Sequence, residues 1–279
     1  MNPHASQPLS PVALVRTCIQ HRNLILQITR REVVGRYRGS AIGLGWSFLN
    51  PLLMLAVFTF VFSVVFQAKW GVAMEGQSEG KGFFAVVLFI GLIVHALFAE
   101  VLTRSPALIL SNVNYVKKVI FPLEILPISA VLSAMFHAAI SIGVWLIAYL
   151  LFVGVPGWQV LFLPLVLLPL IILSLGVSYM LASLGVFLRD IGQTMGILAT
   201  VLLFLSPIFF PIERLPETYQ PLFMANPLTF IIEQARDVLI WHKMPDFTGI
   251  LVYMLCASAV LFVGFAWFQK TRKGFADVL

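Results

Sequence analysis

Long apolar stretches alternate with short polar or charged segments along almost the whole chain. A membrane-spanning helix needs about 20 mostly apolar residues, because each residue adds about 1.5 Å of length. Six stretches reach this length: Ile42–Gln67, Gly82–Leu102, Leu123–Val153, Val160–Leu188, Thr194–Phe210 and Thr248–Phe268. The pattern predicts an all-α integral membrane protein, built as a single transmembrane domain over residues 1–279, with six transmembrane helices between residues 42 and 268.

Two further segments, residues 11–40 and 211–244, fit neither a span nor a plain loop. The first interleaves arginines with five apolar residues: Leu14, Ile19, Leu24, Ile25 and Ile28. This alternation indicates an N-terminal amphipathic helix lying in the cytoplasmic interface of the membrane. The second is apolar but interrupted by four prolines, which break helices. It predicts short re-entrant or interfacial helices on the outer, periplasmic face between helices five and six.

Composition and charge agree with this picture and indicate the orientation. The chain is 60% hydrophobic and 11% charged, whereas a soluble domain carries about 25% charged residues. If both termini are cytoplasmic, thirteen of the 18 Lys and Arg residues fall in inner segments and five in outer ones. The positive-inside rule therefore predicts a multi-pass protein of the bacterial inner membrane with both termini in the cytoplasm. The net charge of +6 does not indicate nucleic-acid binding, because the basic residues are confined to particular segments.

Motifs for catalysis and nucleotide binding are absent from the sequence. There is no P-loop, so we expect this chain not to bind ATP itself and not to be an enzyme. The five histidines have neither His-Glu-x-x-His nor Cys–His spacing, so no metal site is expected. Cys18 and Cys256 do not suggest a disulfide framework, and the first residues do not resemble a cleaved signal peptide.

Ionisable residues within the predicted spans are few. Glu100 and Arg104 are four residues apart near the inner end of helix two, which favours a helix-end ion pair over a functional role. His137 lies deepest, and a hydrogen bond to a neighbouring helix is favoured over a proton relay. Arg189 and Asp190 lie at an inner helix end, where an arginine snorkels to the interface. No chain of buried carboxylates is evident, which disfavours a proton-coupled carrier.

The basic run from Arg30 to Ser40 is the most informative charged segment. Four arginines gather where the amphipathic helix meets the first span: Arg30, Arg31, Arg36 and Arg38. Guanidinium groups bind phosphate through two parallel hydrogen bonds, so these residues are candidates for gripping the pyrophosphate of a lipid carrier. Plain anchoring to anionic lipid headgroups explains the run equally well, and both interpretations stay open.

Aromatic residues make up 13% of the chain and are mostly phenylalanine. Sugar rings present apolar C–H faces that stack on aromatic rings, so a channel lined with them would hold a glycan weakly enough to slide. The candidates on the first and fifth spans are Phe48, Phe58, Phe62, Phe204, Phe209 and Phe210. For any one of them, ordinary packing within the membrane is the favoured interpretation.

Four blocks of sequence resemble a known family: Arg31–Phe66, Ser111–Ile128, Phe187–Gln193 and Ser206–Ile240. They are similar to the type-2 ABC exporter permeases for polysaccharides, most closely the O-antigen (lipopolysaccharide) branch, with teichoic acid and capsule exporters as relatives. The resemblance implies the transmembrane subunit of an ATP-driven transporter, a homodimer working with two separate ATPase subunits that bind ATP and magnesium. It also implies a long glycan on undecaprenyl pyrophosphate as the substrate.

The resemblance also assigns roles to particular residues. The cytoplasmic gate and lipid entry would comprise Arg30, Arg31, Arg36, Tyr37, Arg38 and Trp46. A coupling helix around Asn112–Val119 and the turn before helix five would contact the ATPase. The residues concerned are Asn112, Asn114, Tyr115, Lys117, Lys118, Arg189 and Asp190. The outer segment Ile212–Ile240 would cap the channel exit.

Three alternatives stay open at this stage. A type-2 permease for another cargo, such as a drug or a small lipid, would share the same spans. A membrane-embedded acyl- or glycosyltransferase would need a buried constellation of His, Asp or Glu, which the sequence does not suggest. An ATP-independent flippase would work without an ATPase partner, and the Asn112–Val119 loop would then have no coupling role.

Overall fold

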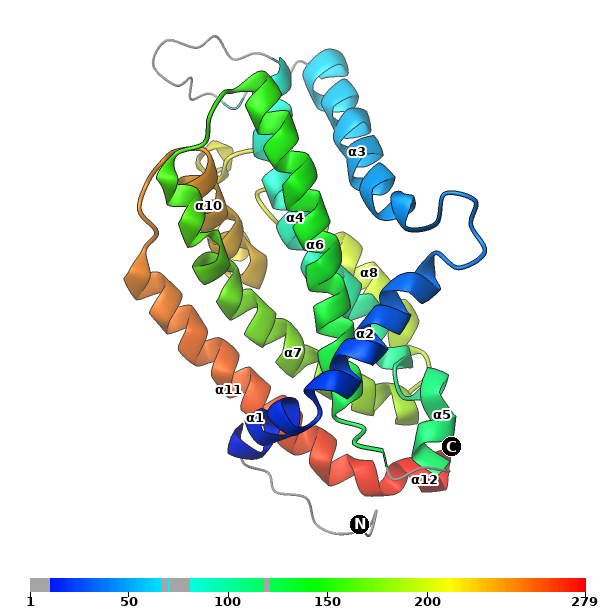
Figure 1. The fold of residues 1–279 in the computed structure, drawn as a ribbon. Helices are drawn as coiled ribbons and strands as arrows, with labels where there is room; N and C mark the ends of the chain where they lie inside the picture. The colour runs from blue at the N-terminus through cyan, green and yellow to red at the C-terminus, as the bar shows by residue number, and fades with distance from the viewer. Residues whose placement is uncertain (1–10, 67–69, 71–80, 118–120) are drawn as a thin grey trace.

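The computed structural model describes residues 11–66, 70, 81–117 and 121–279, and these residues form helices and loops without any strand. The helices stand as an elongated bundle, with α1, α2, α5 and α12 gathered at one end and α10 near the other (Figure 1). The helices are α1 (Pro11–Gln20), α2 (Arg22–Arg36), α3 (Trp46–Phe58), α4 (Lys81–Arg104), α5 (Val113–Lys117), α6 (Ile125–Phe152), α7 (Leu163–Phe187), α8 (Ile191–Phe204), α9 (Gln220–Met224), α10 (Pro227–Leu239), α11 (Phe247–Thr271) and α12 (Phe275–Val278).

Among the residues that the structure describes, five helical segments are long and apolar enough to cross a membrane, and they correspond to five of the six predicted spans. They are Gly43–Phe62, Gly82–Ala107, Ile125–Phe152, Trp158–Phe187 and Phe247–Gly274. The first of these passes from α3 into a π-helical segment, Thr59–Val65. Gln67, the predicted end of that span, lies outside the described residues.

The remaining predicted span, Thr194–Phe210, is shorter than expected. Helix α8 has 14 residues, which is about 21 Å at about 1.5 Å per residue, against a hydrocarbon core of about 30 Å. It begins earlier, at Ile191, and ends at Phe204. Pro207 follows closely, and proline both lacks a backbone N–H and disfavours helical conformation in the residue before it. A hydropathy count alone therefore overestimates this helix.

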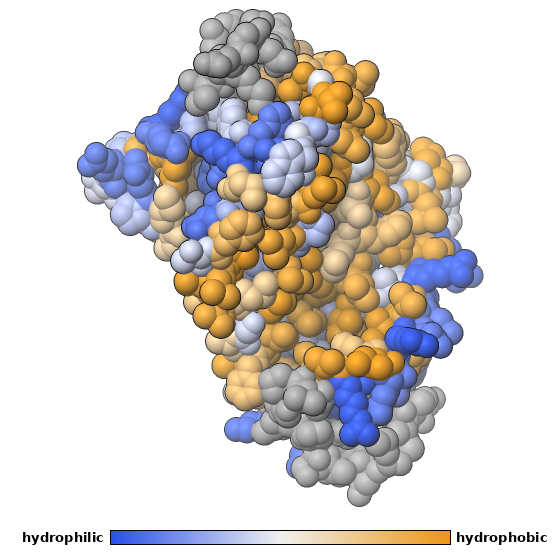
Figure 2. Space-filling view, turned by 60° about the vertical axis from the view of Figure 1, so that its left-hand side comes forward, coloured by the Kyte–Doolittle hydropathy of each residue, from blue (hydrophilic) through white to orange (hydrophobic). Residues whose placement is uncertain are grey.

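Helix α4 is the centre of the bundle. About 72% of its spanning window is buried inside the protein, whereas the figure for the span that contains α3 is 6%. A helix that is apolar all round has to be covered by protein or by lipid. The described part of this chain covers most of α4 but leaves most of the span that contains α3 exposed. Helix α3 lies at the edge of the bundle in Figure 1, where it contacts α6. The face drawn in Figure 2 is mostly apolar, with hydrophilic residues gathered towards its two ends.

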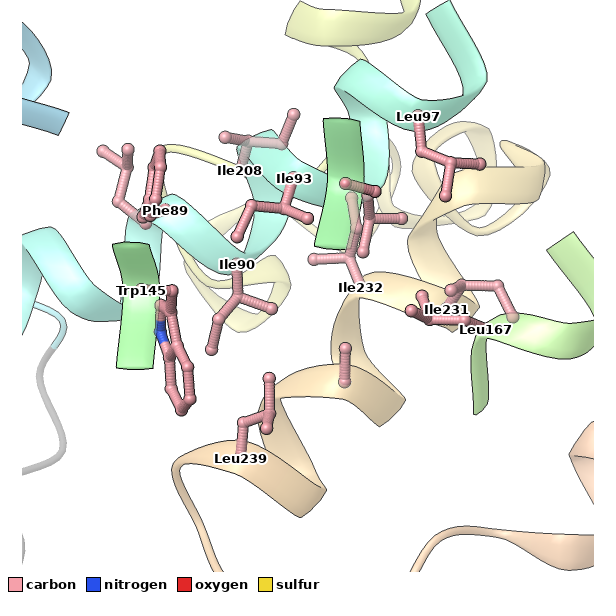
Figure 3. Packing of buried hydrophobic residues seen from close by; sticks show 14 of the residues in the cluster. Phe89, Ile90, Ile93, Leu97, Trp145, Leu167, Ile208, Ile231, Ile232 and Leu239 are labelled. Carbon is pink, nitrogen blue, oxygen red and sulfur yellow. The ribbon is translucent and has the colours of Figure 1, made fainter. Parts of the chain in front are cut away.

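Helix α10 fills the outer part of the core. Figure 3 shows Ile232 and Leu239 of α10 on the side of Ile90 and Ile93 of α4, and Ile231 beside Leu167 of α7. The Asn-Pro pair at its start explains how it begins. Asn226 is the N-cap, its Oδ1 accepting from the Leu228 N–H at 2.9 Å, and the proline occupies the first helical position, where no N–H is needed. The predicted outer segment 211–244 is thus a helix pair, α9 and α10.

The N-terminal segment differs from the single interfacial helix that was expected. It is two helices, α1 and α2, separated at His21. Ile25 and Ile28, predicted to face the membrane interface, are buried, and α2 packs against α6. Ile19 is 67% exposed, so α1 retains a free apolar face. The helix is amphipathic as predicted, but much of its apolar face is covered by protein.

Candidate functional site

An inner charge network joins α2, α4 and α6, and we define it as Glu32, Arg36, Glu100, Arg104 and His137. At its centre, Oε1 of Glu100 lies 3.0 Å from Nη2 of Arg36 and 3.1 Å from Nη1 of Arg104. The other oxygen, Oε2, lies 2.9 Å from Nδ1 of His137. The predicted Glu100–Arg104 ion pair and the predicted hydrogen bond from His137 to a neighbouring helix are both confirmed.

The second carboxylate of the network comes from α2. Oε2 of Glu32 lies 3.4 Å from Nη2 of Arg104, and Ser129 donates to its Oε1 at 3.4 Å. Burial raises the pKa of Glu32 above its ordinary value, and the positive charge of Arg104 opposes that rise. Each cation of the α2–α4 contact therefore faces a carboxylate of the other helix.

Sequence reasoning missed that α2 closes this network. The available signal was a matching spacing: Glu32 and Arg36 are four residues apart, as are Glu100 and Arg104. Residues at that spacing share one face of a helix. When two such helices run in opposite directions, the acid of each helix comes next to the arginine of the other. In the structure, Glu100 lies next to Arg36 and Glu32 lies next to Arg104.

The arginines of the basic run do not form one anion site in the structure. Arg36 contacts Glu100, whereas Arg31 donates to the hydroxyl of Tyr115 at 2.5 Å and lies over its ring at 5.6 Å. Arg30 and Arg38 are exposed and form no ion pair with any residue that the structure describes.

The other two predicted gate residues lie beside this run. The Tyr37 ring meets that of His137 edge-on, with ring centroids 6.1 Å apart. Trp46 donates from Nε1 to Oγ of Ser40 at 2.8 Å. Tyr37 therefore borders the inner charge network, and Trp46 fastens the connection that leads into α3.

The predicted coupling residues lie at the end of the bundle that carries α12 (Figure 1). Tyr115 of α5 stacks on Phe121, with centroids 4.4 Å apart. Just before α6, Arg272 pairs with Glu124 at 2.8 Å and donates to the Phe121 carbonyl at 3.3 Å.

The remaining coupling residues are mostly exposed. Asn112 donates to the Leu108 carbonyl at 2.9 Å, and Asn114 is exposed, as are Arg189 and Asp190 in the turn between α7 and α8. That turn lies at the same end, because Gly185 and Gly192 on either side of it both face Pro106. Lys118, Val119 and the side chain of Lys117 lie outside the described residues.

Four of the six predicted channel aromatics form one aromatic cluster, defined as Phe58, Phe62, Phe204 and Phe209. The centroid of Phe209 lies 4.9 Å from that of Phe62, 5.8 Å from that of Phe58 and 6.0 Å from that of Phe204. The cluster joins the first span to the end of α8. The other two predicted residues lie elsewhere. Phe48 is an exposed residue of α3, and Phe210 packs against Phe223 of α9.

Arg236 of α10 is a second residue that sequence reasoning missed, since it was counted only as one outer cation. Its side chain is completely buried. Nη1 donates to the Pro207 carbonyl at 2.6 Å and to Oε1 of Glu233 at 2.8 Å, while Nη2 donates to the Ile208 carbonyl at 3.1 Å. The guanidinium also lies 4.3 Å from the centre of the Trp70 ring.

The signal for Arg236 was its position on the apolar face of α10. Ile232 lies four residues before it and Leu239 three residues after it, a spacing that places all three on one side of a helix. An arginine there must satisfy its donors inside the protein. In the fold it anchors the chain that follows α8, immediately before Phe209 of the aromatic cluster.

Comparison with known proteins gives concordant matches. The family model described as ABC-2 type transporter matches residues 23–240. The chain is 27% identical to the O-antigen export system permease protein RfbA of Myxococcus xanthus, over 95% of this chain and 99% of that protein. A protein of the same name from Klebsiella pneumoniae is 27% identical, with 92% and 95% covered. The polysialic acid transport protein KpsM of Escherichia coli is 26% identical, with 87% and 91% covered.

Proposed function

The chain belongs to the ABC-2 type transporter family, and from that premise we propose that it is the membrane permease of an ATP-driven exporter of O-antigen-like polysaccharide. The observation that carries the proposal is the extent of its similarity to O-antigen export permeases, which covers nearly the full length of both chains. A capsule-type or teichoic-acid-type polymer is the alternative cargo, and the similarity to a polysialic acid transport protein supports the capsule case.

The membrane arrangement that fits this function has six crossings, with α8 as the short one. The outer end of α8 stops at Phe204, and α10 packs against α4 and α7 beyond that point. Helix α8 alone is too short to cross the membrane, and a re-entrant α9–α10 pair would thus occupy the part of the membrane that α8 does not reach. Six crossings return the chain to the side on which it starts, in keeping with α1 and α12 lying at one end of the bundle (Figure 1). The positive-inside rule makes that end cytoplasmic.

Energy for export would come from a partner, because the sequence has no P-loop. Two ATPase subunits would bind ATP and magnesium and would dock against α5 and the exposed Arg189–Asp190 turn. The contact between Arg31 and Tyr115 would pass movement of α5 to α2. A second copy of this chain would cover the apolar surface of α3, most of which the described residues leave uncovered.

The first test of this assignment is to isolate the tagged chain from cells that carry its own neighbouring genes. We expect an ATPase subunit to co-purify in equal amount, because a permease without a P-loop would need a bound ATPase to drive export. A chain that supports export while no ATPase accompanies it would contradict the assignment and favour an ATP-independent flippase.

The cargo's lipid anchor is proposed to enter beside Arg30, Arg36 and Arg38. Undecaprenyl pyrophosphate is the anchor that the family resemblance implies, and guanidinium groups bind such a phosphate through paired hydrogen bonds. Arg30 and Arg38 are exposed and free of ion pairs among the described residues, which leaves both available to an anion. The aromatic cluster would then provide apolar faces along which the glycan slides.

Replacing Arg36 and Arg38 together with glutamine is expected to slow export of the lipid-linked polymer by roughly tenfold or more, because two charge-assisted hydrogen bonds to phosphate are lost. Surface polymer per cell, measured at matched levels of permease, gives the rate. The Arg22→Gln variant removes one charge from the exposed start of α2 and is the control for general loss of positive charge. Export at the normal rate in the double variant would mean that the pyrophosphate is not held here.

A further inference from the structure

Glu100 has more hydrogen-bonding and ionic partners than a single carboxylate needs. Three of them contact it: Arg36 from α2, Arg104 from its own helix and His137 from α6, at 3.0, 3.1 and 2.9 Å. Removing one partner from a buried ion pair is normally strongly destabilising, because a charge is left unpaired. If Arg36 left, Arg104 would still neutralise Glu100 and His137 would still hydrogen-bond it. Arg36 is therefore the partner that can be exchanged.

Exposure identifies the same residue. The Arg36 side chain is 39% exposed, whereas that of Glu100 is 13% exposed. A ligand approaching from outside thus reaches the guanidinium before it reaches the carboxylate. The carboxylate is held inside the bundle, on α4, whichever group Arg36 binds.

The contact between Arg36 and His137 also favours exchange. Nη1 of Arg36 lies 3.1 Å from Nδ1 of His137, but that nitrogen faces both oxygens of Glu100 at 3.1 and 2.9 Å. A carboxylate offers only acceptors, so the histidine nitrogen must carry the hydrogen. Two donors then face each other, and Nη1 of Arg36 is directed at a group that cannot accept from it. A phosphate oxygen would supply the missing acceptor.

The backbone beyond Arg36 permits the movement. Arg36 is the last residue of α2, and the connection to α3 contains two glycines in the left-handed region, Gly39 with φ of 88° and Gly43 with φ of 57°. Glycine adopts that region without strain. Upstream, Ile25 and Ile28 keep α2 packed in the core. Loss of the Arg36 contact would therefore release the end of α2 and the connection, while the rest of the helix stays in place.

We propose that Glu100 acts as a built-in anion that latches the end of α2, and that a phosphate-bearing anion frees it by taking Arg36 in its place. The identity of that anion rests on the proposed function, in which it is the pyrophosphate of the lipid-linked polymer. The latch itself rests only on the geometry of α2, α4 and α6. When the headgroup binds Arg36, the end of α2 and the connection to α3 would be released and could open.

The latch is testable on the full-length chain in nanodiscs of phosphatidylcholine, by hydrogen–deuterium exchange of the backbone over residues 33–46. Glu100→Gln and Arg36→Gln are both expected to speed exchange in this segment by roughly threefold to tenfold, the range for losing a partly exposed charged contact. Arg36→Gln leaves both other partners of Glu100 in place, so it tests the latch even if the Glu100→Gln variant folds poorly. Arg22→Gln, at the other end of α2, is the matched control and should exchange like the wild type.

The exchange of anions is tested by adding inorganic pyrophosphate to the same nanodiscs. Faster exchange over residues 33–46 in the wild type, and no further change in Arg36→Gln, is the expected result. If nanodiscs containing phosphatidylglycerol alone have the same effect, the phosphate comes from bulk lipid rather than from a pyrophosphate carrier. Unchanged exchange in Arg36→Gln without ligand, or an equal response of wild type and variant to pyrophosphate, would overturn the latch. The experiment needs neither an ATPase nor a polymer. A negative result would therefore contradict the latch and leave the export assignment unaffected.

Discussion

Replacing Arg236 with methionine is expected to lower the free energy of unfolding by about 3–5 kcal/mol, the range for breaking a buried charged network by removing one partner. The side chain is completely buried, and methionine fills similar space without donors. The Pro207 and Ile208 carbonyls, which accept from the guanidinium at 2.6 and 3.1 Å, would lose these donors. A buried group left without a partner costs about 1–3 kcal/mol.

The measurement is the unfolding midpoint of the purified chain in a fixed detergent. Arg214→Met is the matched control, because Arg214 lies on the same outer segment but is exposed, and we expect it to unfold like the wild type. Arg236→Lys keeps the charge but reaches fewer acceptors, so an intermediate midpoint is expected. Equal midpoints for Arg236→Met and the wild type would show that the guanidinium does not anchor the end of α8.

Replacing Gly264 with alanine is expected to be as damaging, by overpacking rather than by loss of a contact. A Cβ at this position would lie 2.2 Å from the backbone oxygen of Gly176 on α7, a distance that no rotamer change can relieve. Helices α7 and α11 would have to separate along their contact, and overpacking of this kind costs about 3 kcal/mol or more where the backbone must move. Close backbone approach at small residues is what drives helices together in membranes.

The check is the yield and unfolding midpoint of Gly264→Ala beside Gly143→Ala. Gly143 lies within α6, and a Cβ there would meet nothing within 4 Å. Alanine favours helix over glycine by about 1 kcal/mol, so Gly143→Ala should match or exceed the wild type. A Gly264→Ala protein as stable as the Gly143→Ala protein would mean that α7 and α11 do not pack this closely.

Hydropathy predicted the spans well because membrane-spanning helices are defined by length and apolar content. It failed at α8, where Pro207 ends the helix although the following residues, such as Ile208 and Phe209, are as apolar as those before. It also placed the apolar face of α2 in the membrane interface, because an amphipathic pattern is the same whether lipid or protein covers it. The burial of Ile25 and Ile28 depends on α6, which lies far away in the sequence.

The candidate sites were predictable where the partners lie close in sequence. Glu100 and Arg104 are one helical turn apart, and their pair was predicted correctly. For Arg36 the sequence left open a grip on a pyrophosphate or plain anchoring to lipid headgroups, and its contact with Glu100 required knowing how α2 lies against α4. Arg236 was overlooked for the same reason, since a cation in an outer segment looks like a solvated one until its carbonyl partners are known.

We propose that this chain conducts a lipid-linked polysaccharide outward at the expense of ATP hydrolysed by a partner. The most direct measurement reconstitutes the permease with its ATPase in vesicles oriented so that the cytoplasmic face is outside, and supplies lipid-linked polymer to that face. The account predicts that polymer becomes enclosed in the lumen only when ATP and magnesium are present. Enclosure at the same rate without ATP, or ATP-dependent transport of other lipids with no transport of the polymer, would contradict it.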